Sequence, residues 1–237
     1  MSPPPIDPTT AFAELGRIKL GEITLDGVLA RVADLAQRAL PGATEVSITL
    51  VRDQRPLTAA STGDMAMQLD NLQYERGAGP CLQAAADKAT VSVPDMAADT
   101  RWRDWPARAA AAGAGSSLSV GLPILENVTG ALNIYGSTPA AFDDDAILLA
   151  QTFAGYAAVA LANAHLYDTT ASLAQHMQTA MESRAVIEQA KGIIMGERRC
   201  TADEAFAILT KVSQGSNRKL RDVAAALVAR AQGTSSP

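Results

Sequence analysis

The sequence is poor in the residues that most often carry chemistry. It has two cysteines, Cys81 and Cys200, far apart in the chain, and two histidines, His165 and His176. Two distant thiols exclude a disulfide framework and a cysteine-rich zinc site, and they fit a reducing compartment. We therefore expect a cytoplasmic protein without a bound metal ion or cofactor.

We expect no segment that directs this chain to or through a membrane. Its first ten residues are rich in proline and have no basic-then-apolar signal pattern, so we expect residues 1–20 to be a disordered leader and residues 232–237 a disordered tail. Residues 146–162 are apolar, but they are rich in alanine and contain Gln151 and Thr152. Since this stretch is shorter than a comfortable span, we expect a packed helix and no membrane partner.

Charge is divided unevenly along the chain. The net charge of −5 argues against a protein that coats nucleic acid, because phosphate neutralisation needs clustered Lys and Arg. Residues 183–237, however, hold nine basic and five acidic residues, a balance of +4, while the first 182 residues hold 11 and 20, a balance of −9. We expect the two parts to have different electrostatic roles.

Patterns in the first part predict an α+β domain with a mainly antiparallel sheet flanked by helices. Thr24 and Asp26 can cap a helix that runs to about residue 39 and stops at Pro41-Gly42. Residues 46–50 alternate apolar and polar as a half-buried strand does, with residues 57–61 as a hairpin partner. Further elements are expected at 64–72, 79–86 and 102–112 (helices) and at 91–93, 118–125 and 128–135 (strands), the last two turning at Glu126-Asn127.

A long helical pattern follows from Asp143 to about Met195. It keeps an apolar face without a strict heptad, which favours a dimerising stalk. Two consecutive helices, each packed on its own domain, are the alternative interpretation.

The end of the chain predicts two more helices. Thr201-Ala-Asp-Glu204 is a capping-box pattern that starts a helix, which ends near Gln214-Gly215. Its expected inward face is Ala205, Phe206, Leu209 and Val212. Ser216 or Asn217 is expected to cap the last helix, and the stalk supplies the first helix of this three-helix unit.

Many positions of the tail match one family at the family's spacing. They are Arg184-Ala-Val-Ile-Glu-Gln-Ala-Lys-Gly-Ile-Ile-Met195, Asp203-Glu-Ala-Phe206, Leu209, Ser213, Asn217 and Lys219-Leu-Arg-Asp-Val-Ala224. This pattern resembles the ANTAR domain of transcription antiterminators and covers about a fifth of the chain. The resemblance implies a three-helix domain over residues 183–231 that binds paired RNA hairpins in nascent transcripts and prevents terminator formation.

Shorter sequence motifs upstream resemble those of a GAF domain of the kind that precedes ANTAR domains in actinobacteria. They are Glu75-Arg-Gly-Ala-Gly-Pro-Cys81, Val93-Pro-Asp, Asp99-Thr-Arg-Trp102 and Gly130-Ala-Leu-Asn-Ile-Tyr135. The resemblance implies a sensor or dimerisation domain over residues 21–164, with residues 165–182 as the helical linker. GAF domains as a class sense small molecules or dimerise, so an unidentified small-molecule ligand is a possible partner.

The tail offers little aromatic surface for stacking on RNA bases, because its only aromatic residue, Phe206, is expected in the core. Contacts must then come from Lys and Arg to phosphates and from small polar groups to loop bases. The expected RNA-binding residues are Arg184, Lys191, Gly192, Ser213, Asn217, Arg218, Lys219 and Arg221. A glycine inside a helix costs about 1 kcal/mol relative to alanine, so Gly192 needs a reason: close approach of RNA, or of a crossing helix.

Two residues of the front domain are candidates for sensing. Cys81 follows Gly79-Pro80 at a predicted helix start, where a lowered pKa would favour oxidant sensing, although a buried structural thiol is the alternative. Trp102 is a candidate ligand contact or a side chain packed over the sheet edge. Thiol-based reduction usually needs a second, resolving cysteine, which the domain lacks, so we expect no enzymatic activity.

These observations together predict a signal-responsive, RNA-binding antitermination regulator that works as a homodimer. A DNA-binding transcription factor is one alternative, but it would normally show a short helix-turn-helix with an exposed recognition helix. A GAF-based redox or ligand-sensing enzyme is the other.

Overall fold

The computed structural model describes residues 4–125 and 128–233. The chain divides into two compact units with a boundary between Asp168 and Thr169. Helix α6, Asp144–Arg198, supplies residues to both units. The predicted turn at Glu126-Asn127 lies outside the described residues. The other elements of the first unit are α1 (Pro8–Gly16), α2 (Leu25–Ala39), β1 (Glu45–Arg52), β2 (Arg55–Ser61), α3 (Asp64–Arg76), α4 (Pro80–Asp87), β3 (Thr90–Val93), α5 (Trp105–Ala111), β4 (Ser116–Leu125) and β5 (Val128–Gly136).

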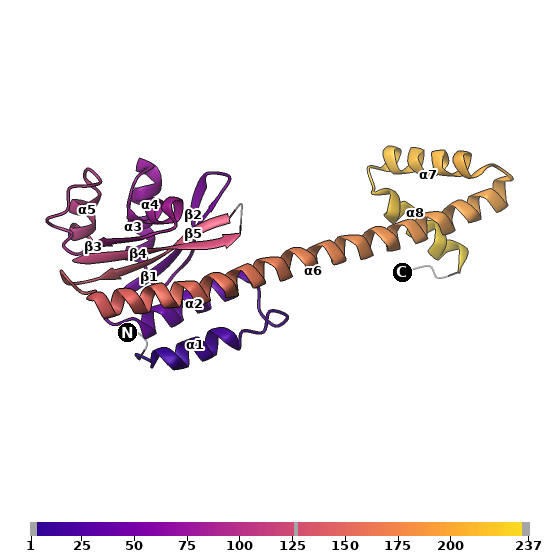
Figure 1. The fold of residues 1–237 in the computed structure, drawn as a ribbon. Coiled ribbons are helices and arrows are strands. Elements are labelled where there is room, and N and C mark those ends of the chain that lie inside the picture. Colours follow the sequence, from indigo (N-terminus) through magenta and orange to yellow (C-terminus); the bar gives the residue numbers. More distant parts are fainter. Residues whose placement is uncertain (1–3, 126–127, 234–237) are drawn as a thin grey trace. The chain divides into compact units, whose positions relative to one another are not determined.

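The five strands form one antiparallel sheet in the order β2-β1-β5-β4-β3 (Figure 1). This confirms the predicted α+β fold and its sheet. In the register of the sheet, Ser47 of β1 and Ser119 of β4 both stand opposite Asn133 of β5. A row of polar side chains therefore crosses the middle of the sheet.

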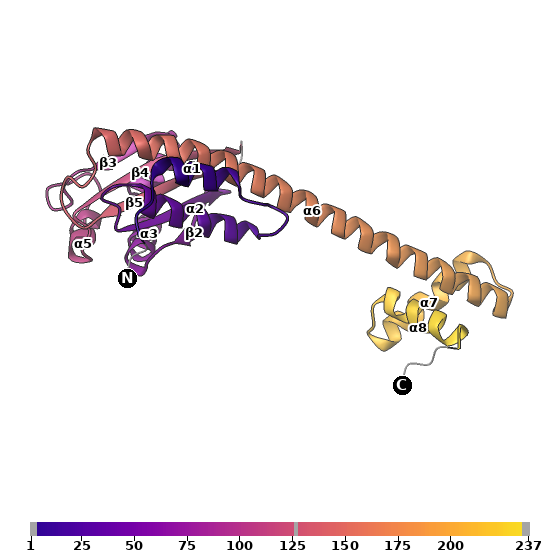
Figure 2. The ribbon, with the colours of Figure 1, turned by 90° about the horizontal axis from the view of Figure 1, so that it is seen from below.

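One face of the sheet is covered by α1, α2 and α6 (Figure 2). The apolar residues of the strands, such as Ile48 and Leu132, are fully buried there against Val32 and Leu35 of α2. The predicted cap of α2 is confirmed, since the Thr24 hydroxyl accepts a hydrogen bond from the Gly27 amide at 3.2 Å.

The apolar start of α6 belongs to this same core. Helix α6 is long and apolar enough to cross a membrane by composition, but its buried residues recur at helical spacing and pack on the sheet side. These residues are Ala150, Phe153, Ala157, Leu161 and Ala164. A helix that buries one stripe in a protein core is typical of a water-soluble domain.

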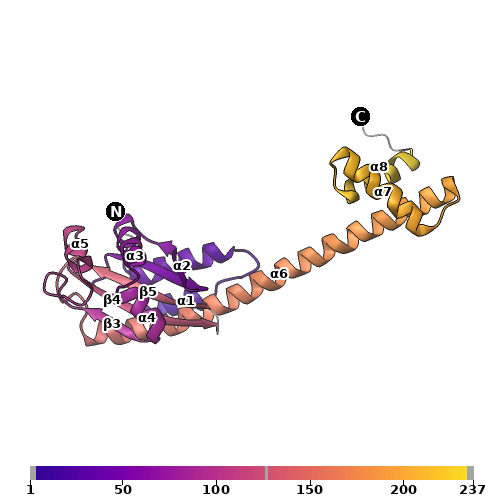
Figure 3. The same cartoon turned by 90° about the horizontal axis from the view of Figure 1, so that it is seen from above.

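The opposite face carries α3, α4 and α5 (Figure 3). Trp105 and Tyr135 are the largest side chains buried beneath these helices, and the Trp105 indole nitrogen donates to the Leu69 carbonyl at 3.1 Å. Helix α4 lies close to the sheet at Gly121, where a Cβ would come within 2.4 Å of the Ala84 carbonyl oxygen. Only glycine fits this contact.

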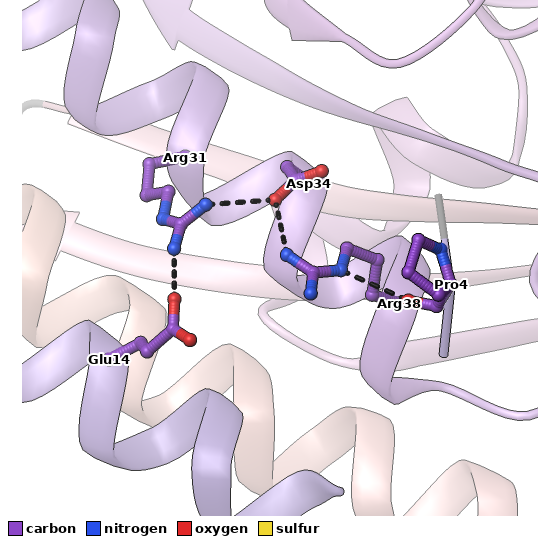
Figure 4. A network of polar contacts seen from close by, with 5 residues as sticks. All are labelled: Pro4, Glu14, Arg31, Asp34 and Arg38. Carbon is purple, nitrogen blue, oxygen red and sulfur yellow. Dashed lines mark hydrogen bonds and ion pairs between the residues drawn. The ribbon is translucent and has the colours of Figure 1, made fainter. Parts of the chain in front are cut away.

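The prediction that residues 1–20 are a disordered leader is wrong for the described part from residue 4. Asp7 caps α1, Pro8 occupies the first turn, where proline fits a helix, and Ala11 and Leu15 are buried in the core. Polar contacts also tie this segment to α2 (Figure 4). Glu14 pairs with Arg31, and the Arg38 guanidinium donates to the Pro4 carbonyl oxygen at 3.1 Å. Within α2, Asp34 pairs with both arginines, at 3.1 Å from Arg31 and 3.3 Å from Arg38.

The second unit consists of the end of α6, α7 (Ala202–Ser216) and α8 (Leu220–Ala231). The capping box is confirmed: the Thr201 hydroxyl accepts from the Glu204 amide at 3.3 Å, and the Glu204 carboxylate accepts from the Thr201 amide at 2.8 Å. Ala190, Ile194, Ala205, Leu209 and Ala224 form its buried core.

Three expectations for the helices need correction. Helix α6 is unbroken, so the alternative of two consecutive helices is wrong. Asn217 does not cap the last helix; it ends α7 in the left-handed region (φ 53°), which asparagine tolerates, and Lys219 takes the N-cap position of α8. Phe206 and Val212 are not core residues, and Val212 is 50% exposed. Ala205 and Leu209 face the other helices, which turns Phe206 outward and leaves it 44% exposed.

Candidate functional site

Three basic residues lie along one edge of α6 in the second unit. Arg184, Lys191 and Arg198 are each seven residues apart, and seven residues make almost two helical turns. Arg184 and Arg198 are exposed, whereas the Lys191 side chain is only 17% exposed and its ammonium lies 3.0 Å from both carboxylate oxygens of Glu188. We call these three residues the basic stripe. Arg198 was not among the residues expected to bind RNA, although the same spacing of seven points to it.

The backbone next to the stripe is open. A Cβ added at Gly192 or Gly196 would meet no heavy atom within 4 Å. The alternative that a crossing helix of this chain requires Gly192 is therefore wrong for the described residues. An approach by RNA remains an expectation for this position.

The α7–α8 turn holds the remaining predicted RNA-binding residues. The Ser213 hydroxyl donates to the Arg218 carbonyl at 2.6 Å, and the Arg218 amide donates to the Ser213 carbonyl at 3.1 Å. Ser213 therefore closes the turn, and its hydroxyl proton is used within the protein. Asn217, Arg218 and Lys219 are exposed, and Arg221 is near Asp222, with 3.4 Å between the guanidinium and the carboxylate.

A second cluster of functional groups is buried in the first unit, between the sheet and α3. Tyr135 donates to Asp70 Oδ1 at 2.8 Å, Thr58 donates to Oδ2 at 2.9 Å, and the Asn133 amide nitrogen lies 3.4 Å from Oδ1. The Tyr74 phenol joins Thr49 and Thr58 at 2.9 Å each. We call this set the Asp70 cluster: Ser47, Thr49, Thr58, Asp70, Tyr74, Asn133 and Tyr135.

Burial sets the acid–base properties of the cluster. Asp70 is fully buried, and the loss of solvation raises the pKa of its carboxyl to about 6. Hydrogen bonds from Ser47, Tyr135 and Thr58 lower this pKa, but their effect is smaller than that of burial. Burial, together with the nearby Asp70 charge, also raises the pKa of Tyr135 well above its usual value. Two buried atoms, Asn133 Oδ1 and Ser117 Oγ, have no hydrogen-bond partner among the described residues. The cluster thus holds a carboxyl whose pKa is raised to about 6, and a buried Asn133 oxygen with no hydrogen-bond partner among the described residues lies within it.

Cys81 lies beside this cluster and is completely buried. Burial and the charge of Asp70 raise the pKa of its thiol well above the usual value. Oxidant sensing needs the opposite shift, so the structure favours the structural role for Cys81. Its amide donates to the Gln73 side chain at 2.9 Å, which fixes the start of α4 on α3.

Trp102 is half-buried at the sheet edge, where it packs edge-on against Trp105 with 6.1 Å between ring centroids. The Arg101 guanidinium lies over the Trp102 ring, 4.3 Å from its centroid, and Asp99 accepts hydrogen bonds from that guanidinium at 2.6–2.9 Å. These neighbours support packing as the role of Trp102. Within the described residues, no group of three or more His, Cys, Asp or Glu side chains is placed to hold a metal ion.

Comparison with known families agrees with the two units. The family model of the GAF domain matches residues 22–162, more than half of the chain. The chain belongs to the GAF family. The model of the ANTAR domain matches residues 175–228, so this GAF protein carries an ANTAR domain behind its sensor fold. The ANTAR match begins inside the segment expected to be the linker. No curated protein matches the chain by sequence.

Solved structures similar to this GAF protein share its sheet and flanking helices. The reduced form of fRMsr of Staphylococcus aureus is 17% identical and covers 66% of this chain and 96% of its own, with a TM-score of 0.53. The GAF domain of a phosphoenolpyruvate-protein phosphotransferase from Coxiella burnetii is 16% identical and covers 68% and 95%, with a TM-score of 0.51. These identities show a common fold and nothing more.

The two domains define the general function. A GAF domain followed by an ANTAR domain makes the chain a GAF-regulated, RNA-binding antitermination regulator. Both domains are regulatory. The predicted RNA-binding residues lie within the ANTAR match, on the edge of α6 and in the α7–α8 turn.

The Asp70 cluster was not predicted, although the sequence holds a signal for it. Asp70 belongs to the set Ala66, Leu69, Asp70 and Gln73, whose spacing of three and four places all four on the buried face of α3. A carboxylate on a buried helical face needs partners, and Tyr135 and Thr58 supply them.

Proposed function

We propose that this GAF–ANTAR protein binds paired RNA hairpins in nascent transcripts as a parallel homodimer, in the cytoplasm, and so prevents terminator formation. The observation that carries the proposal is the basic stripe on α6, together with the exposed Arg218 and Lys219, in a protein that is otherwise acidic. Counterion release from RNA phosphates would supply much of the affinity.

The homodimer is supported by apolar side chains that α6 leaves exposed. Val159, Leu166 and Leu173 are each seven residues apart and are 61%, 64% and 59% exposed. A spacing of seven is typical of a seam between two supercoiled helices. When one ANTAR domain of a dimer is bound, the second acts at high effective concentration, so two modest loop contacts give useful affinity.

The GAF domain would supply the input, through a small molecule or another signal that changes the population of two states of the dimer. The Asp70 cluster supports such a role because Asn133 Oδ1 is buried and has no partner among the described residues.

The test is a binding selection with the full-length protein. A pool of RNAs with two stem-loops and randomised loops is offered with single stem-loops and double-stranded DNA as competitors. We expect enrichment of dual stem-loops that single stem-loops displace poorly. Displacement by duplex DNA would indicate a DNA-binding factor instead. A monomer at micromolar concentration in analytical ultracentrifugation, with and without RNA, would contradict the dimer.

A further inference from the structure

The three helices of the ANTAR unit enclose a groove of about 610 Å³. Its apolar surface comes from Ile208 and Val212 of α7 and Leu227 of α8, and its basic surface from three arginines, Arg198, Arg218 and Arg230. The volume falls within the range of roughly 300–1,000 Å³ that small-molecule sites occupy. Every residue that lines it belongs to the second unit.

The arginines of the groove are poorly neutralised. Glu197 is the single carboxylate in the lining. Neither Arg198 nor Arg230 has an ion pair or side-chain hydrogen bond among the described residues, and the Arg218 guanidinium reaches only the Asp222 backbone oxygen at 3.4 Å. The groove therefore offers three guanidinium groups to an anionic occupant.

The occupant must also have an apolar surface. Val212 is 50% exposed, and Ile208 and Leu227 are half-buried, so apolar area lies open between the arginines. An unstacked nucleobase with its flanking phosphates has both properties: a planar ring with apolar faces, and anionic oxygens on either side. Arginine suits both the base and the phosphates, because its guanidinium forms bidentate hydrogen bonds with phosphate and stacks on planar rings.

The groove continues from the basic stripe, because Arg198 belongs to both. A strand whose phosphates follow Arg184 and Lys191 would reach Arg198 and the groove next. This continuity favours RNA over the other class of occupant with matching chemistry, an acidic amphipathic helix of a partner protein.

We propose that this groove is a base-binding subsite, in which one unstacked base of an RNA loop packs on Val212, Ile208 and Leu227 while Arg198, Arg218 and Arg230 hold the adjacent phosphates. The inference rests on the proposed function and adds to it the place where a loop base is bound. It also assigns a role to Arg230, which hairpin binding through the stripe and turn does not require, and it gives Arg198 of the stripe a second contact in the groove.

The test uses the full-length protein and a dual stem-loop RNA obtained from the randomised-loop selection, with 2-aminopurine at each loop position in turn. Val212→Glu places a carboxylate among the three arginines at an exposed position that tolerates a polar side chain. Gln214→Glu is the matched control, since it adds the same charge at an exposed position on the opposite side of α7. Arg230→Ala is the second variant.

We expect Val212→Glu and Arg230→Ala each to weaken binding by about tenfold or more, and Gln214→Glu to change it by less than about threefold. One loop position should show a 2-aminopurine signal that changes on binding to the wild type and is lost in Val212→Glu. Far-ultraviolet circular dichroism checks that each variant keeps its helices.

The outcomes separate the two proposals. If the wild type does not prefer dual stem-loops, the proposed function fails. If it does prefer them but Val212→Glu and Arg230→Ala bind as the wild type does, the base-binding subsite is overturned. If RNA binding is unchanged in these variants while antitermination in a transcription reaction is lost, the groove binds a protein instead.

Discussion

The Tyr135 phenol donates a 2.8 Å hydrogen bond to Asp70, and both side chains are buried in the GAF domain. No cation accompanies this carboxyl: its hydrogen-bond partners among the described residues are hydroxyl and amide groups. Burial without a counter-charge disfavours the ionised form, which is why the pKa of Asp70 rises. The pair therefore couples the stability of the domain to pH.

The first prediction concerns this coupling. Because the pKa of Asp70 rises from 3.8 to about 6 on folding, the folded state holds the proton more tightly than the unfolded state. The contribution of Asp70 to the free energy of unfolding is complete below pH 3.8 and is lost as pH rises through about 6, a change of roughly 3 kcal/mol.

Asp70→Asn should flatten this pH dependence and raise the free energy of unfolding at pH 7.5. Urea denaturation followed by tryptophan fluorescence measures it, since both tryptophans belong to the first unit. The exposed Asp87→Asn is the control. Parallel pH profiles for the wild type and Asp70→Asn would show that Asp70 does not titrate in this range.

The second prediction concerns Cys81. Because burial raises the pKa of its thiol, native protein at pH 7.5 should leave Cys81 unmodified by iodoacetamide or peroxide, whereas the half-buried Cys200 reacts faster. Mass spectrometry of peptides gives the two rates, and both thiols should react alike in urea. Oxidation of Cys81 ahead of Cys200 in native protein would restore the redox interpretation.

The third prediction concerns helix α1. Leu15 is 5% exposed, so Leu15→Ala should lower the free energy of unfolding of the first unit by about 2–3 kcal/mol. The exposed Thr10→Ala is the control in the same helix and should change it by less than about 0.5 kcal/mol. Equal stability of the two variants would mean that α1 does not dock on the core.

The fourth prediction concerns Phe206 and Leu209, neighbours on α7 with different burial. Leu209 is 2% exposed, and Leu209→Ala should cost about 2–5 kcal/mol and speed amide hydrogen exchange in α7 and α8. Phe206→Ala should leave that exchange within about twofold of the wild type, because the ring is 44% exposed. Faster amide hydrogen exchange in Phe206→Ala would show that the Phe206 ring contributes to the core.

The fifth prediction concerns Lys219, an exposed residue of the α7–α8 turn. If its ammonium neutralises an RNA phosphate, Lys219→Ala should lower the slope of log affinity against log salt by about one. Lys19→Ala, which removes a lysine that is 72% exposed in the first unit, is the charge-matched control. Identical slopes for both variants and the wild type would remove Lys219 from the interface.

Elements of this fold were predictable where local pattern and burial agree. Thr24 caps α2 and the capping box starts α7, because both signals act within one helical turn. Residues 46–50 were expected to be a half-buried strand, yet Ser47 and Thr49 are fully buried. Alternation shows which face of a strand is polar. It does not show whether that face contacts water or, as here, polar side chains of a helix such as α3.

The sites were less predictable because they depend on contacts between helices. The spacing of Phe206 in the sequence matches an apolar helical face. The structure shows that Ala205 and Leu209 occupy the core and that Phe206 points outward. The Ser213 hydroxyl is an expected RNA contact, and its bond to the Arg218 carbonyl, which closes the α7–α8 turn, was not predicted from the sequence. Arg198 and Arg230 come together only when α6 and α8 fold beside α7.

The bond between Lys191 and Glu188 has a consequence for selectivity. If an RNA phosphate binds the Lys191 ammonium, it competes there with the Glu188 carboxylate, so part of the new ion pair is offset by the one that it weakens. On that condition Glu188 would compete with every polyanion alike and so weaken non-specific binding. Replacing it with glutamine should make the protein adhere more strongly to any RNA while it discriminates less well among them.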